Sequence, residues 1–182
     1  ATVGGEPRLL FPGGNGILYG FKPLAAQSSK DGPPAPLEKA FEFDFDPTAP
    51  KENIHQFVQN RSEGPSNFYG MPVVVGSSVY LAGGGDVFWG KNDAWLKRID
   101  LSVKDGRETA TEAWSCPLEQ HTLCTPAVAD GLVFATDTAR NVHCVEATTG
   151  KILWTHGCTG SFWASTLVAD GKVMVGSRSG DF

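Results

Sequence analysis

Short apolar runs alternate with polar turn residues along most of the chain, and no helix-length pattern separates them. The clearest example is residues 125–137, TPAVADGLVFATD, in which Asp130 and Gly131 separate two β-rich segments. An Asp-Gly pair between such segments predicts a two-residue hairpin turn, because both central residues of that turn need a positive φ. Two further β-rich segments follow at 141–146 and 151–154, separated by the turn ATTG. Connections this short predict a meander of four antiparallel strands.

The same pattern occurs more than once along the chain. Residues 165–177, STLVADGKVMVGS, repeat the hairpin 40 residues after its start at 125, and a more divergent copy, MPVVVGSSVYLAG, occupies 71–83. Four short strands in each period of about 40 residues are typical of a β-propeller blade. The sequence therefore predicts an all-β protein of four-stranded antiparallel blades, stacked because one blade cannot bury its own faces.

The repeats divide the chain into parts of four blades. We expect the end of a blade at 1–45, a long loop at 46–69, a blade with a long insertion at 70–115, a blade at 122–156 and half of a blade at 162–182. In the long loop, Ile54, Phe57 and Val58 have helical spacing, which predicts a short helix. Because propellers close with about four to eight blades, we interpret the chain as a fragment with an incomplete ring. Completion by other copies of the chain is the alternative.

Composition and charge narrow the class of protein. Hydrophobic residues make up 41% of the 182 residues and charged residues 19%, which is typical of a globular protein. The net charge of −5 argues against nucleic acid or an anionic membrane as the main partner. No apolar run approaches the roughly 18 residues that a transmembrane helix needs.

Residues 144–154, CVEATTGKILW, resemble the tryptophan-docking motif of the pyrroloquinoline-quinone-like propeller repeats. That motif reads Ala-x-Asp-x-x-x-Gly-x-x-x-Trp, so Gly150 and Trp154 match it, while Cys144 and Glu146 replace its Ala and Asp. The resemblance implies that Trp154 packs on the neighbouring blade and helps to hold the ring together.

Earlier copies of the motif are more divergent. Trp114 occupies the tryptophan position of the preceding blade, although six extra residues separate it from Arg98. Phe41 occupies the same position in the first copy, where Gly20 and Lys22 replace the Ala and Asp of the motif. The three copies are in register with the hairpin repeat and together predict the fold.

Fold does not determine function in the family that the chain resembles. Its members include quinone-dependent alcohol and sugar dehydrogenases and also non-enzymatic propellers, such as the lipoprotein of the outer-membrane barrel-assembly machinery. The dehydrogenases use pyrroloquinoline quinone, a calcium ion, an aspartate base and, for alcohols, a disulfide between adjacent cysteines; this sequence has no Cys-Cys pair. We expect a non-enzymatic, exported scaffold or binding module without a cofactor, located in the periplasm, at the cell surface or outside the cell. The alternatives are a fragment of a quinone-dependent dehydrogenase, with its quinone and calcium, and a carbohydrate-binding or hydrolytic propeller.

Antiparallel blades direct their loops to two faces. The loops between second and third strands, and the connections from blade to blade, emerge on one face, which we call the loop face. It collects the long segments 44–69, 83–94, 115–124, 137–140 and 156–164. The hairpin turns emerge on the other face, the turn face, where we expect tight turns only. Because long loops on a rigid scaffold usually carry binding, we expect a protein partner or small ligand at the loop face. Exposed blade flanks also predict self-association.

Four residues of the loop face are candidates for contact with a ligand or partner. Trp89 lies near the tip of the glycine-rich segment 83–93, where it either contacts a ligand or folds back over the blade. Trp163 precedes an innermost strand, where it either floors a pocket or plugs the channel. Arg140 and Arg178 occupy near-equivalent places in successive loops and either form a cationic ring that attracts an anion or are solvated.

Cysteine and histidine residues gather in two adjacent loops: Cys116, His121, Cys124, His156 and Cys158. Their spacing matches no zinc motif, so we favour one disulfide among the three cysteines over a metal site. Cys144 lies within a strand and is expected to be a buried, inert thiol. His143 lies in a third strand and is expected to pack or hydrogen-bond there. The sequence gives no catalytic residue.

Overall fold

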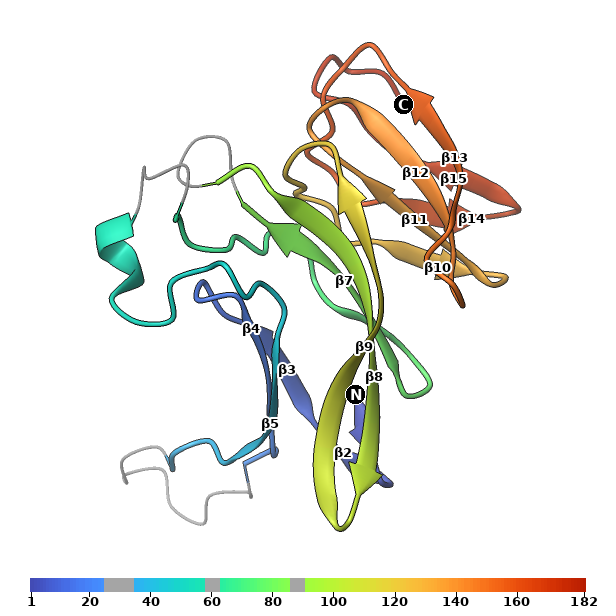
Figure 1. Cartoon of the computed structure of the whole chain (residues 1–182). Helices are drawn as coiled ribbons and strands as arrows, with labels where there is room; N and C mark the ends of the chain where they lie inside the picture. The colour runs from blue at the N-terminus through green and yellow to red at the C-terminus, as the bar shows by residue number, and fades with distance from the viewer. Residues whose placement is uncertain (25–34, 58–62, 86–90) are drawn as a thin grey trace.

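The computed structural model describes residues 1–24, 35–57, 63–85 and 91–182. In these ranges the regular secondary structure is β-strand, apart from a single turn of 3-10 helix at Ile54–Phe57 (Figure 1). That turn lies where the sequence predicts a short helix, and Val58 lies outside the described residues. No helix in the described ranges has the length and apolar character needed to cross a lipid bilayer.

The strands form successive antiparallel meanders, which are the blades of a β-propeller that does not close into a ring (Figure 1). The first blade contains three strands, β3 (Leu9–Pro12), β4 (Ile17–Phe21) and β5 (Lys39–Asp44). The second is complete, with β6 (Val73–Val75), β7 (Ser78–Gly84), β8 (Ala94–Lys104) and β9 (Arg107–Leu118). The third is also complete, with β10 (Ala127–Ala129), β11 (Leu132–Thr136), β12 (Asn141–Glu146) and β13 (Ile152–Gly157). The fourth contains β14 (Leu167–Ala169) and β15 (Lys172–Met174). The predicted fold class is confirmed.

Contacts between blades show how the sheets are arranged. The innermost strands β6, β10 and β14 contact one another in succession, and the outermost strands β5 and β9 are also in contact. This arrangement places the first strands side by side at the inner end of the blades.

The hairpin turns have the backbone that their residues favour. Asp130 and Gly131 have φ values of 50° and 76°, and the Asp170-Gly171 pair has 49° and 66°. Both central residues are thus in the left-handed region, as a type I′ turn requires. The sequence prediction for this turn is confirmed.

A β-bulge recurs at the docking position of the first three blades, whose outermost strands are β5, β9 and β13. The register pairs Gly20 with Phe41, Arg98 with Trp114, and Cys144 with Trp154, and it shifts after the first residue of each pair. A bulge inserts one extra residue and bends the strand. The aromatic side chains of the three outer strands therefore sit at the same point of a repeated distortion.

The turn face differs from the prediction, because it does not carry tight turns only. Strand β7 begins at Ser78, which pairs with Asp100 of β8. Beyond this point β8 and β9 pair only with each other, as far as Lys104 and Arg107, and form a projecting hairpin (Figure 1). The six extra residues before Trp114 lengthen this hairpin. The connection 22–38 between β4 and β5 is also long.

The N-terminal segment packs against the projecting hairpin. A small hairpin of β1 (Thr2–Val3) and β2 (Glu6–Pro7) places Val3 in the core, and Gly4 lies against the side chain of Val103. The Arg8 guanidinium Nε donates to both carboxylate oxygens of Glu108, at 3.0 and 2.9 Å. The chain's first residues therefore fasten the first blade to the second.

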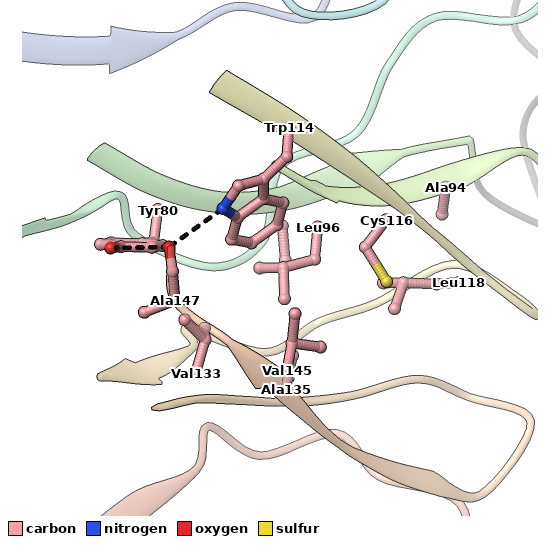
Figure 2. Close-up of a cluster of buried hydrophobic side chains, with 11 residues drawn as sticks. Tyr80, Ala94, Leu96, Trp114, Cys116, Leu118, Val133, Ala135, Val145 and Ala147 are labelled. Atoms are coloured by element: carbon pink, nitrogen blue, oxygen red, sulfur yellow. Dashed lines mark hydrogen bonds between the residues drawn. The ribbon is translucent and has the colours of Figure 1, made fainter. Parts of the chain in front are cut away.

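The hydrophobic core lies between neighbouring blades, as expected for sheets that cannot bury their own faces. One cluster joins the first and second blades and contains Val3, Leu18, Phe41, Phe45, Val79, Leu81, Ile99 and Leu101. The other joins the second and third blades and contains Tyr80, Ala82, Ala94, Leu96, Trp114, Cys116, Leu118, Val133, Ala135, Val145 and Ala147 (Figure 2).

Candidate functional site

The joint between the second and third blades is built around Trp114 of β9 (Figure 2). Its indole Nε1–H donates to the carbonyl oxygen of Ala147 at 3.0 Å. The Tyr80 hydroxyl and a guanidinium nitrogen of Arg98 donate to the same oxygen at 3.3 and 3.2 Å. The ring also lies against Gly150, where an added Cβ would come within 2.7 Å of ring carbons. Trp114 therefore joins two blades by packing and by hydrogen bonding.

The other two aromatic residues of the docking position have different surroundings. Phe41 of β5 is buried in the cluster between the first and second blades. Trp154 of β13 is 44% exposed and lies 6.0 Å, centre to centre, from the ring of Phe134. It lines an apolar hollow of about 410 Å³ beside Val142 and Val173.

A buried ion pair fastens two long segments of the loop face to each other. The Lys91 ammonium contacts the Asp46 carboxylate and the Thr48 hydroxyl, and the Ser66 hydroxyl also donates to Asp46. Burial alone would raise the pKa of Asp46, but the hydrogen bonds from Lys91, Ser66 and Thr48 outweigh burial and lower it. The backbones of Gly85 and Lys91 also lie close together, since a Cβ on Gly85 would come within 1.6 Å of the Lys91 carbonyl oxygen.

A second buried polar chain links the loop after β11 to the third and fourth strands of its blade. His143 Nε2 lies 2.9 Å from an Asp137 carboxylate oxygen, and His143 Nδ1 lies 3.0 Å from the Thr155 hydroxyl. Burial would raise the pKa of Asp137, but hydrogen bonds from His143 and Asn141 outweigh it and lower the pKa. His143 is thus hydrogen-bonded within the sheet, as predicted.

One position of the repeat carries large side chains in three successive blades. It lies four residues before the innermost strand and is occupied by Tyr69, Leu123 and Trp163. Tyr69 and Trp163 are 50% and 47% exposed. Met71, two residues after Tyr69, is also exposed. Aromatic and apolar surface therefore collects at the inner end of the loop face.

The inner ends of the blades are joined by a repeated hydrogen bond. The Met71 N–H donates to the Thr125 hydroxyl at 2.9 Å, and the Thr125 N–H donates to the Ser165 hydroxyl at 3.0 Å. At this position each of two blades donates a backbone N–H to a hydroxyl of the following blade.

The structure brings two of the four loop-face candidates into contact. The guanidinium carbon of Arg178 lies 4.0 Å from the ring centre of Trp163, close enough for a cation–π interaction. Arg140 contacts the segment that leads to Trp163, because its guanidinium donates to the carbonyl oxygen of Thr159 at 3.5 Å. Trp89 lies outside the described residues.

The two arginines do not occupy equivalent positions, which corrects the sequence interpretation. Loops 137–141 and 177–181 both close with a hydrogen bond from the first residue's N–H to the fifth residue's carbonyl oxygen. Arg140 is the fourth residue of its loop, whereas Arg178 is the second. The equivalent of Arg140 is Gly180, and both have a positive φ, 75° and 89°. The two arginines approach the same segment from two neighbouring blades.

Comparisons with known proteins agree with this blade geometry. Residues 92–181 match the family model described as outer membrane protein assembly factor BamB. Residues 92–181 thus match a model of the pyrroloquinoline-quinone-like β-propeller repeat. The family resemblance noted from the sequence is therefore confirmed. A comparison with curated proteins finds no match.

Three solved structures are similar to parts of this chain. A europium-containing methanol dehydrogenase is 20% identical, with a TM-score of 0.46 over 61% of this chain and 21% of its own. BamB from Moraxella catarrhalis is 12% identical, with a TM-score of 0.40 over 95% of this chain and 65% of its own. The computationally designed Ika8 protein is 12% identical, with a TM-score of 0.39 over 95% of this chain and 53% of its own. The chain thus spans less than two thirds of the length of each.

The four cysteines are free thiols, so the predicted disulfide is wrong. Cys116 belongs to the cluster between the second and third blades. Cys124 is buried, with its sulfur 3.8 Å from the Thr166 hydroxyl, and Cys158 lines the hollow beside Trp154. Cys144 is buried as predicted, and burial raises the pKa of its thiol.

The described ranges show no convergence of three or more His, Cys, Asp or Glu side chains that could hold a metal ion. Calcium takes six to eight oxygen ligands, and the buried carboxylates of Asp46 and Asp137 are engaged with Lys91 and His143.

Several features of the site were missed by sequence reasoning. The ion pair of Asp46 and Lys91 joins residues far apart in the chain, and no local pattern marks it. Tyr69 could have been found, because extending the divergent repeat at 71–83 backwards places it level with Trp163.

Proposed function

We propose that this chain is a non-enzymatic, exported propeller module that binds a protein partner at its loop face. The observation that carries the proposal is the repeated position before the innermost strand, where Tyr69 and Trp163 are about half exposed. Aromatic residues and Met are enriched in the cores of protein interfaces, and Met71 adds to the same surface. The second and fourth blades present these exposed residues on a rigid scaffold, which keeps the entropic cost of binding low.

The buried polar groups of the described residues stabilise the scaffold that carries the loop face. Lys91 and Asp46 hold two long segments together, and His143 holds Asp137 and Thr155 within one blade. These groups satisfy one another, which is what buried polar groups require for stability. The matching family model describes an outer membrane protein assembly factor, and we extend an extracytoplasmic, partner-binding role to this chain on that basis.

Site-specific photocrosslinking in the cells that produce the protein tests the proposal. Benzoylphenylalanine replaces Trp163 or Tyr69 on the loop face, and Val103, which is 49% exposed on the projecting hairpin, is the matched control. We expect one protein to crosslink from both loop-face positions and not from Val103. The purified partner should then bind the purified chain, and Trp163→Ser should weaken its Kd at least tenfold. Equal crosslinking from both faces, or a Kd unchanged by Trp163→Ser, would contradict the proposal.

The alternatives are tested on the same purified protein. Pyrroloquinoline quinone is titrated with Ca²⁺ while its fluorescence is followed, and dye reduction is measured with alcohols and sugars. Saturable quinone binding with dye reduction would replace the proposal by a dehydrogenase. Binding on a glycan array that is lost in Trp163→Ser would replace it by a carbohydrate-binding module, for which the exposed indole of Trp163 is the favourable observation.

A further inference from the structure

We propose that Arg140, Trp163 and Arg178 form a docking site for an acidic segment of the protein partner. We call these three residues the arginine–tryptophan site. This proposal rests on the partner-binding function above and adds the chemistry that the partner must present. The sequence relates the two arginines to each other but not to Trp163, and the structure gathers all three around a single segment, residues 159–163.

The segment 159–163 crosses from the third blade to the fourth, with an arginine on each side. From the third blade, the Arg140 guanidinium donates to the carbonyl oxygen of Thr159 at 3.5 Å. From the fourth blade, the Arg178 N–H donates to the carbonyl oxygen of Ser161 at 2.9 Å. The Arg178 guanidinium carbon lies 4.0 Å from the centre of the Trp163 ring, and Trp163 is still 47% exposed.

The two arginines of the site differ from other arginines of the protein in their charge partners. In the described part of the chain, no carboxylate lies within ion-pair distance of Arg140 or Arg178, whereas Arg8 and Arg98 are paired with Glu108 and Asp100. Both side chains of the site belong to exposed residues. Two positive charges thus lie beside an exposed indole, on a chain with a net charge of −5. The Asp181 carboxylate, which accepts a hydrogen bond from the Thr159 hydroxyl at 3.4 Å, is the negative charge that touches the same segment, and the two arginines outnumber it.

The backbone of Arg140 gives an independent reason to assign it a function. Its φ of 75° lies in the left-handed region, which disfavours any residue with a Cβ. The equivalent position holds glycine in two other blades, Gly16 with φ 76° and Gly180 with φ 89°. A side chain kept in a strained conformation, where the repeat elsewhere has glycine, is typical of a functional position.

The chemistry of the site selects its partner. A guanidinium matches a carboxylate in a planar, two-bond geometry, and this pairing is stronger than a neutral hydrogen bond. Trp and Arg are the residue types most enriched among those that dominate binding energy in protein interfaces. The exposed part of Trp163 accepts an apolar side chain next to the carboxylate. The expected occupant is therefore a segment in which Asp or Glu alternates with apolar residues.

A peptide array with matched pairs tests this inference. Each acidic–apolar peptide is printed beside a copy in which Asn and Gln replace Asp and Glu, and the fluorescently labelled chain is applied at low salt. We expect the acidic member to bind at least fivefold more strongly, and salt at 0.5 M to remove most of this difference, since screening weakens exposed ion pairs.

Variants separate the site from general electrostatics. Arg140→Gln and Arg178→Gln should each abolish the preference for the acidic peptide. Arg107→Gln, at an exposed arginine on the turn face, removes the same charge and should leave the preference intact. Thermal unfolding of the three variants, which alter exposed side chains, checks that each remains folded.

The outcomes are distinguishable from those of the crosslinking experiment. Equal binding of acidic and neutral peptides, or equal losses in Arg107→Gln and Arg178→Gln, would overturn the docking site. A single-stranded oligonucleotide that binds more tightly than the peptides and displaces them would also overturn it. A crosslinked partner whose affinity is unchanged by Arg140→Gln and Arg178→Gln would leave the binding function standing and remove this site alone.

Discussion

Gly150 and the indole of Trp114 approach so closely that no side chain fits between them. An added Cβ on Gly150 would lie 2.7 Å from two ring carbons of Trp114. The two residues belong to neighbouring blades, and the same indole donates to the carbonyl oxygen of Ala147. This contact therefore sets how closely the second and third blades can stack.

Gly150→Ala tests how much the close packing of Gly150 against Trp114 contributes to the free energy of unfolding. Both Gly150 and Gly131 have a positive φ, 75° and 76°, but a Cβ at Gly131 would meet nothing within 4 Å. We expect Gly131→Ala to cost about 1 kcal/mol from backbone strain alone. Gly150→Ala should cost about 1–3 kcal/mol more, because overpacking adds to the strain. Equal losses in chemical denaturation would show that Trp114 does not limit the blade spacing.

Lys91→Met tests the buried ion pair of the loop face. Removing the ammonium leaves the Asp46 carboxylate buried without its cation, which we expect to cost about 3–5 kcal/mol. The double variant Asp46→Asn/Lys91→Met should recover part of this loss, because no charge stays buried. Lys172→Met is the control, since the Lys172–Asp170 pair is exposed and worth about 0–1 kcal/mol. A Lys91→Met variant as stable as the control would contradict a structural role.

The depressed pKa of Asp137 predicts loss of stability in acid. A carboxyl group with a lower pKa in the folded state stabilises the protein above the unfolded value of about 3.9, and this contribution is lost as the pH falls through the folded pKa. Asp137→Asn should therefore lower stability at neutral pH and flatten its decline below about pH 4. Denaturation curves from pH 2 to 6 measure both effects. Asp170→Asn, at an exposed carboxylate, should leave the curve unchanged.

Arg140→Gly separates stability from binding. Glycine relieves the left-handed backbone strain at this position, so we expect a gain of about 1 kcal/mol, seen as a rise of roughly 2–4 °C in Tm for a chain of this size. The same variant should lose the preference for acidic peptides. A fall in Tm would show that the Arg140 side chain stabilises the loop, and that its strain has a structural cause.

Trp154→Ser tests self-association through the exposed flank of the third blade. The indole is 44% exposed beside an apolar hollow of about 410 Å³, and exposed apolar surface of this kind favours association. We expect the wild-type chain to show a concentration-dependent mass in light scattering, and Trp154→Ser to shift it towards the monomer. Trp163→Ser, on the loop face, should not change the mass. The same mass for all three proteins would contradict association at this flank.

The sequence predicted the fold well because a repeated pattern reports a repeated structure. The Asp130-Gly131 turn follows from local backbone preferences, and its 40-residue spacing from the copy at 165–177 indicates stacked units. The site was less predictable, since its contacts join distant segments. No sequence pattern around Lys91 indicates Asp46 as its partner. Which residue of loop 177–181 is equivalent to Arg140 depends on the hydrogen bond that closes each loop. The projecting hairpin could have been predicted, because the six extra residues between Arg98 and Trp114 lie in a connection between third and fourth strands, which belongs to the turn face.

The hydrogen bonds from Met71 to Thr125 and from Thr125 to Ser165 give the inner end of the blades a direction. Thr125 of the third blade accepts a hydrogen bond through its hydroxyl and donates one through its backbone N–H. The blade therefore has an accepting side and a donating side at this seam. Duplication of a unit with both groups would reproduce the seam at the new junction. This part of the architecture can therefore change its number of units by gene duplication while every junction keeps the same connector.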